Sequence, residues 1–299
     1  MDAGSSLRGI LLVAGATFFW SLSGVFVRWL PDIDPWSFNA FRGLGLGLSM
    51  ALWIALRYGR GSLNLLRRSP VAGLLVSAGF FALGSSLYIA SLDLASVAAV
   101  SCLTATSGLF AALMARLFLG ERTPPIFYFA MLLALGGVAV IALGEGDARV
   151  QGLAGTFTGL AVAACFAAQS VALRRYRAFD MEPAFLLGGF VTFAAIMALG
   201  LVVVPPWQNI AVLLLMGLVQ LAIPLVLYMY GARSVATSHM VLITMADAVL
   251  NPLWVWMVHA EVPPHAVYLG GALVLGAIAL TAFSPPVSAT PASTGVTDP

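Results

Sequence analysis

The chemistry-bearing residues of this sequence centre on Asp247, which stands near the middle of a long apolar stretch, residues 234–261. An acid at the centre of a membrane helix costs about 2.5 to 3.5 kcal/mol, so it normally faces a partner or a wet cavity rather than lipid. At helical spacing from Asp247, the same face carries Met240, Thr244, Asn251 and Trp254. A face that is polar and aromatic at this depth predicts a binding site.

Arg42 is the other full charge deep in an apolar stretch, about seven residues from its start. Three roles are open for Asp247: binding a substrate ammonium, carrying a coupling proton, or pairing with Arg42 in a purely structural ion pair. Arg42 is suited to pair with that acid or to clamp a substrate carboxylate with its planar fork, and it can also reach the outer interface.

Hydroxyls, amides and rings complete the candidate binding residues. Thr104 and Ser107 are predicted to line a cavity opposite Asp247, or to bond their own helix backbone. Gln169 and Gln220 are candidates for the same cavity or for bridges between helices. Trp20 lies at mid-depth, away from either interface, and is predicted to form a stacking wall for the substrate.

Tyr88 is predicted to close one end of the path or to anchor its helix at the interface, as tyrosines near helix ends do. Hinges are expected where the helices are weakened. Pro252 withholds its N–H from the carbonyl of Ala248, and Pro224 does the same to Gln220. Gly84 and Gly108 are the corresponding weak points of the first half.

The composition is that of a polytopic membrane protein, with 61% apolar and 9% charged residues. A span needs about 20 apolar residues. The apolar runs predict ten spans, at residues 9–30, 36–57, 70–91, 96–118, 124–144, 152–174, 183–204, 208–231, 235–258 and 264–284.

Several kinds of chemistry are excluded or disfavoured. All 14 basic residues are arginine, and without lysine the chain has neither the P-loop of an ATP-driven pump nor a Schiff base for retinal. The three histidines have no metal-ligand companions at suitable spacing, and neither an HExxH nor a GxSxG string occurs. No metal, no cofactor and no nucleic acid partner is therefore expected, and an intramembrane enzyme is the poorer hypothesis.

The arginines predict the orientation of the chain. With the N-terminus in the cytoplasm, eleven of them fall in inner segments, two in outer segments, and one, Arg42, inside a span. Such a bias favours both termini in the cytoplasm. The sequence therefore predicts a multi-pass protein of a bacterial inner membrane, with residues 1–8 and a disordered tail, 285–299, on the cytoplasmic side.

The second half of the sequence repeats the first. A shift of 140 residues aligns uncommon residues in the same order, including Tyr88 with Tyr228, Thr104 with Thr244, Glu121 with Glu261, Pro124 with Pro264 and Tyr128 with Tyr268. Because each half has five spans, the second half enters the membrane upside down relative to the first. The expected fold is all-α, with ten transmembrane helices in two inverted five-helix repeats, residues 9–144 and 152–284, joined by an outer loop, 145–151. This architecture is typical of secondary transporters.

The doubled segment carries a family resemblance. Gly120-Glu121-Arg122-Thr123-Pro124 and Ala260-Glu261-Val262-Pro263-Pro264 each precede a Gly-rich helix, although Ala260 departs from the usual Gly-Glu pattern. Over residues 9–284 the chain resembles the EamA-type carriers of the drug/metabolite transporter superfamily and, more narrowly, the exporters of aromatic amino acids among them. The resemblance implies a central cavity between the halves and export of amino acids or similar metabolites.

The predicted function is therefore export of amino acids, aromatic or otherwise apolar, by alternating access across the inner membrane. The partners are the amino acid and the lipid bilayer. The oligomeric state is open, and a monomer is compatible with the sequence. A pore-like channel is the alternative, and it would show flux that does not saturate. An embedded enzyme would release a chemically altered product.

Overall fold

A computed structural model describes residues 3–30, 32–94, 100, 103–104, 106–120, 124–144, 153–176, 178–235, 237–260 and 265–282. The predicted connecting loop, 145–151, the predicted tail, 285–299, and the paired acids Glu121 and Glu261 lie outside these ranges.

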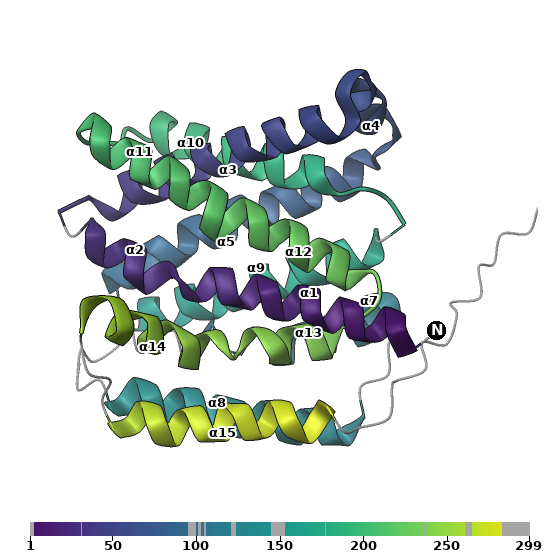
Figure 1. The fold of residues 1–299 in the computed structure, drawn as a ribbon, viewed down its shortest axis with the longest axis vertical. Helices are drawn as coiled ribbons and strands as arrows, with labels where there is room; N and C mark the ends of the chain where they lie inside the picture. Colours follow the sequence, from purple (N-terminus) through teal and green to yellow (C-terminus); the bar gives the residue numbers. More distant parts are fainter. Residues whose placement is uncertain are drawn as a thin grey trace, which may run out of the picture.

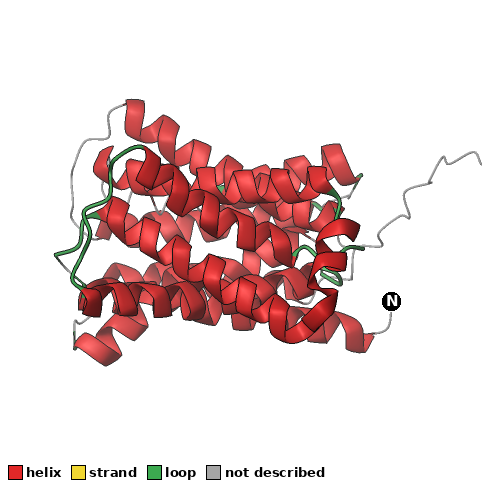
Figure 2. Ribbon diagram, turned by 90° about the horizontal axis from the view of Figure 1, so that it is seen from above, coloured by secondary structure: helices red, strands yellow, loops and turns green. Residues whose placement is uncertain are grey.

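Within the described ranges every regular element is a helix, and no strand occurs (Figure 2). The first half contains α1 (Ala3–Ser21), α2 (Ser23–Trp29), α3 (Pro35–Tyr58), η1 (Gly59–Gly61), α4 (Ser62–Arg68), α5 (Val71–Leu94), α7 (Ser107–Leu119) and α8 (Pro125–Gly144). The second half contains α9 (Leu153–Arg175), α10 (Glu182–Ala198), α11 (Trp207–Met216), η2 (Gly217–Ala222), α12 (Ile223–Ala232), α13 (Thr237–Thr244), α14 (Asp247–His259) and α15 (His265–Ala282).

Among these residues, six helical segments are long and apolar enough to cross a membrane, and four shorter apolar helices accompany them. Together they correspond to the ten predicted segments, and the predicted all-α membrane fold is confirmed. One segment is shorter than predicted. The helix expected over 183–204 ends at Ala198, because Gly200 adopts a left-handed φ of 69° and the chain then runs extended to the prolines at 205 and 206.

The helices α3 and α10, which form the second span of each half, pack against each other in antiparallel orientation. Ser37, near the start of α3, accepts a hydrogen bond from the backbone N–H of Val203, beyond the end of α10, and Arg57 at the other end contacts Glu182. Between these ends the backbones nearly touch. A Cβ on Gly189 would lie 2.6 Å from the carbonyl oxygen of Gly43 and from the backbone nitrogen of Gly47, which is the close approach that small residues permit.

The fifth helices, α8 and α15, repeat this arrangement at one edge of the molecule (Figure 1). A Cβ on Gly137 of α8 would lie 2.5 Å from the carbonyl oxygen of Gly270 in α15. The contact joins the later part of α8 to the earlier part of α15, as expected for helices that run in opposite directions. Antiparallel pairing of equivalent helices places the two halves in opposite senses, and this is the inverted repeat that the sequence predicts.

The repeat extends to the details of single helices. The helices α7 and α14 are both 13 residues long, and each is preceded by a turn that interrupts its span. Each ends at a left-handed residue, Gly120 with φ of 67° and Ala260 with φ of 56°. Ala260 is therefore the position at which the sequence departs from glycine while the backbone keeps the glycine-like conformation.

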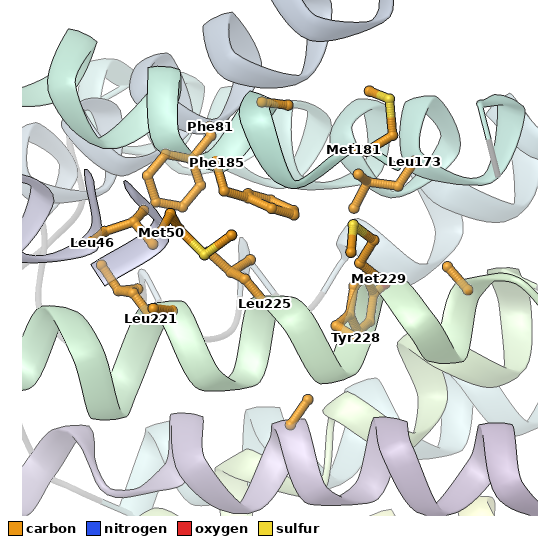
Figure 3. Packing of buried hydrophobic residues seen from close by; sticks show 14 of the residues in the cluster. Leu46, Met50, Phe81, Leu173, Met181, Phe185, Leu221, Leu225, Tyr228 and Met229 are labelled. Atoms are coloured by element: carbon orange, nitrogen blue, oxygen red, sulfur yellow. The ribbon is translucent and has the colours of Figure 1, made fainter. Parts of the chain in front are cut away.

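The largest buried cluster joins the two halves (Figure 3). Leu46 and Met50 come from α3, Phe81 from α5, Phe185 from α10 and Leu225 from α12. Phe81 and Phe185 meet edge to face with ring centres 6.4 Å apart, which is a favourable geometry for an aromatic pair. Two smaller buried clusters also combine residues of both halves, so several apolar contacts hold the halves together.

Candidate functional site

Arg42 lies inside the bundle in a cluster of neutral polar groups. It donates from Nη2 to Oδ1 of Asn39 at 3.1 Å and, weakly, from Nη1 to Oε1 of Gln220 at 3.4 Å. Ser85 of α5 donates to the same Asn39 oxygen at 2.7 Å. Two further donors, Nε of Arg42 and Nδ2 of Asn39, are buried without a hydrogen-bond partner. The cluster therefore contains a cation and two spare donors, which are available to an acceptor, and no acid is among these hydrogen-bond partners.

Asp247 is the first residue of α14 and is partly accessible. Its Oδ1 atom is buried without a hydrogen-bond partner. Between the two described residues Arg42 and Asp247 the structure has no ion pair, and Tyr88 lies within electrostatic reach of both. The α14 N-terminus supplies its own partial positive charge, which stabilises a carboxylate at this position.

The predicted weak points coincide with irregular helix. Just before Pro224 the helix changes to the wider π-helical hydrogen-bond pattern in η2. This change accommodates the carbonyl that proline leaves without a donor. Near Pro252 the interruption lies before Asp247, at Met245 and Ala246, where the backbone N–H groups bond three residues back. The helix α14 runs on through residue 252, whose side chain lies outside the described set. The break therefore places the acid in a first helical turn.

Trp20 of α1 and Tyr228 of α12 form an aromatic pair. Their ring centres are 5.3 Å apart, and Tyr228 is buried and shares a hydrogen bond of 3.1 Å with Ser170. Trp20 is half-buried and packs against the main core cluster. Tyr228, the repeat partner of Tyr88, is therefore part of the interior and does not anchor an interface.

Asn251 and Trp254 belong to the Asp247 helix but direct their polar atoms to the junction between α1 and α2. Asn251 donates to Oγ of Ser23 at 2.9 Å and accepts from the N–H of Gly24 at 3.1 Å. Trp254 donates from Nε1 to Oγ of Ser21 at 2.8 Å. These bonds satisfy backbone and hydroxyl groups that the interruption of the first span exposes.

The remaining predicted residues are distributed around the centre. Thr104 and Ser107 flank the turn that precedes α7, and Thr244 ends α13; all three are half-buried. Gln169 lies on α9, almost fully buried, and its Nε2 has no hydrogen-bond partner. Gly84 and Gly108 are buried within α5 and α7, and a Cβ on Gly84 would approach Cys165 and Phe166.

A second polar cluster lies at the end of the bundle where α3 finishes. The carboxylate of Glu182 is fully buried, and its Oε1 accepts hydrogen bonds from Arg57 at 2.8 Å, Tyr230 at 2.8 Å and Trp53 at 3.2 Å. Its Oε2 has no hydrogen-bond partner. Because Trp53 and Arg57 belong to the first half and Tyr230 to the second, this one carboxylate joins the halves.

Beside it, Arg233 of the second half pairs with Asp180 in the turn before α10. Burial acts to raise the pKa of Asp180, but the hydrogen bond and charge of Arg233 outweigh it and hold that pKa below its usual value. Asp180 is therefore an ionised partner of Arg233 at neutral pH.

Asn39, Ser85 and Glu182 are among the residues that are absent from the predicted site. Asn39 and Ser85 had a signal, because each stands one helical turn from a predicted residue, Arg42 and Tyr88 respectively. Glu182 had none, because it falls at a predicted joint where acids are usually solvated. Among the described residues no group of three or more His, Cys, Asp or Glu side chains is placed to hold a metal ion.

Comparisons with known proteins bear on what this arrangement serves. Residues 7–143 match the model of the EamA-like transporter family. A solved structure titled "Crystal structure of protein" superimposes with a TM-score of 0.79 at 21% identity, over 94% of this chain and 97% of that one, which shows a shared fold. No curated protein matches the sequence. The matched segment is slightly less than half of the chain, so its first half is similar to the EamA-like transporter family.

Proposed function

We propose that the protein is a secondary transporter that exports amino acids across a bacterial inner membrane by alternating access. The similarity of residues 7–143 to a transporter family supports a membrane transporter, and the polar groups of the interior support the class of substrate. One observation carries the proposal. Arg42 and Asn39 present unpaired donors, Asp247 presents an unpaired acceptor, and Tyr88 lies within electrostatic reach of both Arg42 and Asp247.

A buried polar group without a partner costs about 1 to 3 kcal/mol, so these groups are arranged for a ligand or for water that a ligand displaces. A carboxylate accepts from the guanidinium and the amide, and an ammonium donates to Asp247. An α-amino acid is a small molecule that carries both groups at once. In this proposal Gln220 holds the guanidinium in place, and Thr104, Ser107, Gln169 and Thr244 line the same path.

The side chain of the substrate is assigned to the aromatic pair. Trp20 and Tyr228 provide ring faces and edges on which an aromatic or aliphatic group packs favourably. Asn251 and Trp254, by contrast, support the path from outside by holding α14 against the junction of α1 and α2.

The two five-helix units, residues 9–144 and 152–284, are proposed to rock against each other about this centre. The interruptions before α7 and α14 and the π-helical turn beside Pro224 supply bending points in both units, with Gly84, Gly108 and Pro252 nearby. Arginine distribution supports cytoplasmic termini, and the Glu182 cluster then closes the cytoplasmic end.

The test is competition in proteoliposomes that contain the purified protein and take up labelled phenylalanine. Phenethylamine lacks the carboxylate and 3-phenylpropionate lacks the ammonium. Each charge-assisted hydrogen bond is worth about 1.5 to 3 kcal/mol, so each analogue is expected to compete at least about tenfold more weakly than phenylalanine. Uptake is expected to saturate, and the recovered substrate is expected to be unaltered.

Arg42→Gln should remove the preference for phenylalanine over phenethylamine, because the carboxylate then has no cation to bind. The exposed Arg116→Gln, on α7, is the matched control and should keep the preference. Equal competition by both analogues in the unaltered protein rejects the amino acid as substrate. Flux that rises without saturation identifies a channel instead.

A further inference from the structure

A hollow of about 420 Å³ opens at the end of the bundle where α3 gives way to η1 and α4. It lies between these elements and the turn that precedes α10. Its lining includes Tyr58, Asn64, Leu65, Arg68, Phe179 and Asp180. None of these residues takes part in the Arg42 and Asp247 centre, so the hollow requires an explanation of its own.

The polar groups of the hollow offer donors. Arg68 and Asn64 are exposed, and within the part of the chain that the structure describes Arg68 has no hydrogen bond or ion pair. The hydroxyl of Tyr58 is buried beside the carboxylates of Glu182 and Asp180, so it does not offer a donor to the hollow. The acid on the rim, Asp180, is already paired with Arg233. The uncompensated charge that faces the hollow is therefore positive, and the groups around it match the oxygens of an anion.

The apolar groups and the position of the hollow indicate where that anion comes from. Leu65 and Phe179 line it, and Phe179 is 44% exposed. Trp53 and Tyr58 mark the end of α3, and such rings lie at the level of the lipid headgroups. The neighbouring arginines Arg60 and Arg67 are exposed on η1 and α4. A soluble inorganic anion has no apolar group to pack against Leu65 and Phe179, whereas a lipid presents a phosphate and an acyl chain together.

We propose that this hollow binds the headgroup of an anionic phospholipid from the adjoining leaflet. The phosphate oxygens accept from Arg68 and Asn64, and the glycerol and upper acyl carbons lie against Leu65 and Phe179. Arg60 and Arg67 add long-range attraction to the negative leaflet. The site fixes α4 and the turn before α10 at the membrane surface.

The test is native mass spectrometry of the purified, delipidated protein titrated with phosphatidylglycerol or with phosphatidylcholine of the same chain length. Phosphatidylglycerol should be retained preferentially. An arginine near an anionic surface contributes about a fivefold change in binding, so Arg68→Gln should lower retention by about that factor. Asn64→Ala removes a neutral donor and should lower it by a smaller factor. Arg116→Gln, an exposed arginine outside the hollow, should leave retention unchanged.

Three results would overturn the proposal. Equal retention of the two lipids shows that charge is not recognised. Equal loss in Arg68→Gln and Arg116→Gln shows general surface attraction without a site. Displacement of phosphatidylglycerol by millimolar inorganic phosphate identifies a soluble anion as the ligand. If Arg68→Gln fails to fold, the Asn64→Ala titration decides, because an unchanged retention there places the headgroup elsewhere.

Discussion

At the scale of single residues, the interior charges are held without neutralising one another. Arg42 is surrounded by the neutral acceptors Asn39 and Gln220, and Asp247 starts a helix whose first N–H groups and dipole favour a carboxylate. A direct ion pair between them would have satisfied both charges and left nothing for a substrate. Their separation leaves a positive and a negative group each in need of a partner.

Asp247→Asn tests the role of that acid. The amide keeps the size of the side chain but carries no charge for a substrate ammonium, so phenylalanine flux in proteoliposomes should fall at least about tenfold. The melting temperature should change little, because Oδ1 has no hydrogen bond to lose. The exposed Asp32→Asn is the control, and unaltered flux in Asp247→Asn would remove the acid from the binding site.

At the scale of helices, the antiparallel pair α3 and α10 is one of the contacts that join the two halves. Its centre depends on Gly43, Gly47 and Gly189, and its end on the fully buried Glu182. Small residues allow the backbones to approach, and the carboxylate gathers donors from both halves. Close backbone packing thus stabilises the centre of this helix pair, and polar bonding stabilises its end.

Gly189→Ala should disrupt this pair. The added methyl group would lie 2.6 Å from backbone atoms of Gly43 and Gly47, which have no side-chain freedom to yield. The expected loss is about 1 to 3 kcal/mol, measured as a lower midpoint of thermal unfolding in detergent. Gly136→Ala on α8 is the control, because a Cβ there meets nothing within 4 Å, and alanine should be neutral or stabilising by up to about 1 kcal/mol.

Glu182→Gln tests the polar end of the same pair. Glutamine preserves the volume but leaves Arg57 without its counter-charge, and removing one partner of a buried pair costs several kcal/mol. Because the Arg57 side chain is 37% exposed, we expect a smaller loss of about 2 kcal/mol. The measurement is thermal unfolding of Glu182→Gln, Arg57→Gln and the double variant. Strictly additive losses would show that the two side chains are not coupled.

At the scale of the whole molecule, two pairs of equivalent helices define the relation between the halves. Equivalent helices meet antiparallel in α3 with α10 and in α8 with α15, so the halves are related by an axis across the helices, not along them. The start of α1 and the end of α15 lie on the same side of the bundle, and α4 lies on that side too (Figure 1).

Cysteine labelling of intact cells tests the orientation of this arrangement. In a background without Cys102 and Cys165, Asp32→Cys should react with a membrane-impermeant maleimide, and Arg60→Cys should react only after the cells are opened. The reason is the accumulation of arginine on the side of α4. The reverse pattern would place that side, and both termini, outside the cell.

The sequence by itself determined the spans and the repeat, because in lipid every backbone group must be satisfied within its own segment and the apolar runs therefore mark the helices directly. It also identified Arg42 and Asp247, since a charge at mid-span is conspicuous in an apolar chain. Only the tertiary structure decided where those side chains point. Asn251 and Trp254 share a helix with Asp247, yet they bind Ser23 and Ser21, more than 200 residues away in the chain.

The same limit applies to the ends of the bundle. Glu182 stands at a joint in the sequence, where an acid is normally solvated, and its burial follows from the approach of Arg57 and Tyr230 from two other helices. That Arg42 and Asp247 remain unpaired likewise depends on the distance between α3 and α14 in the assembled bundle. Distances between helices are set by packing of the two halves, including the glycine contacts of α3 with α10, and no local pattern of residues encodes them.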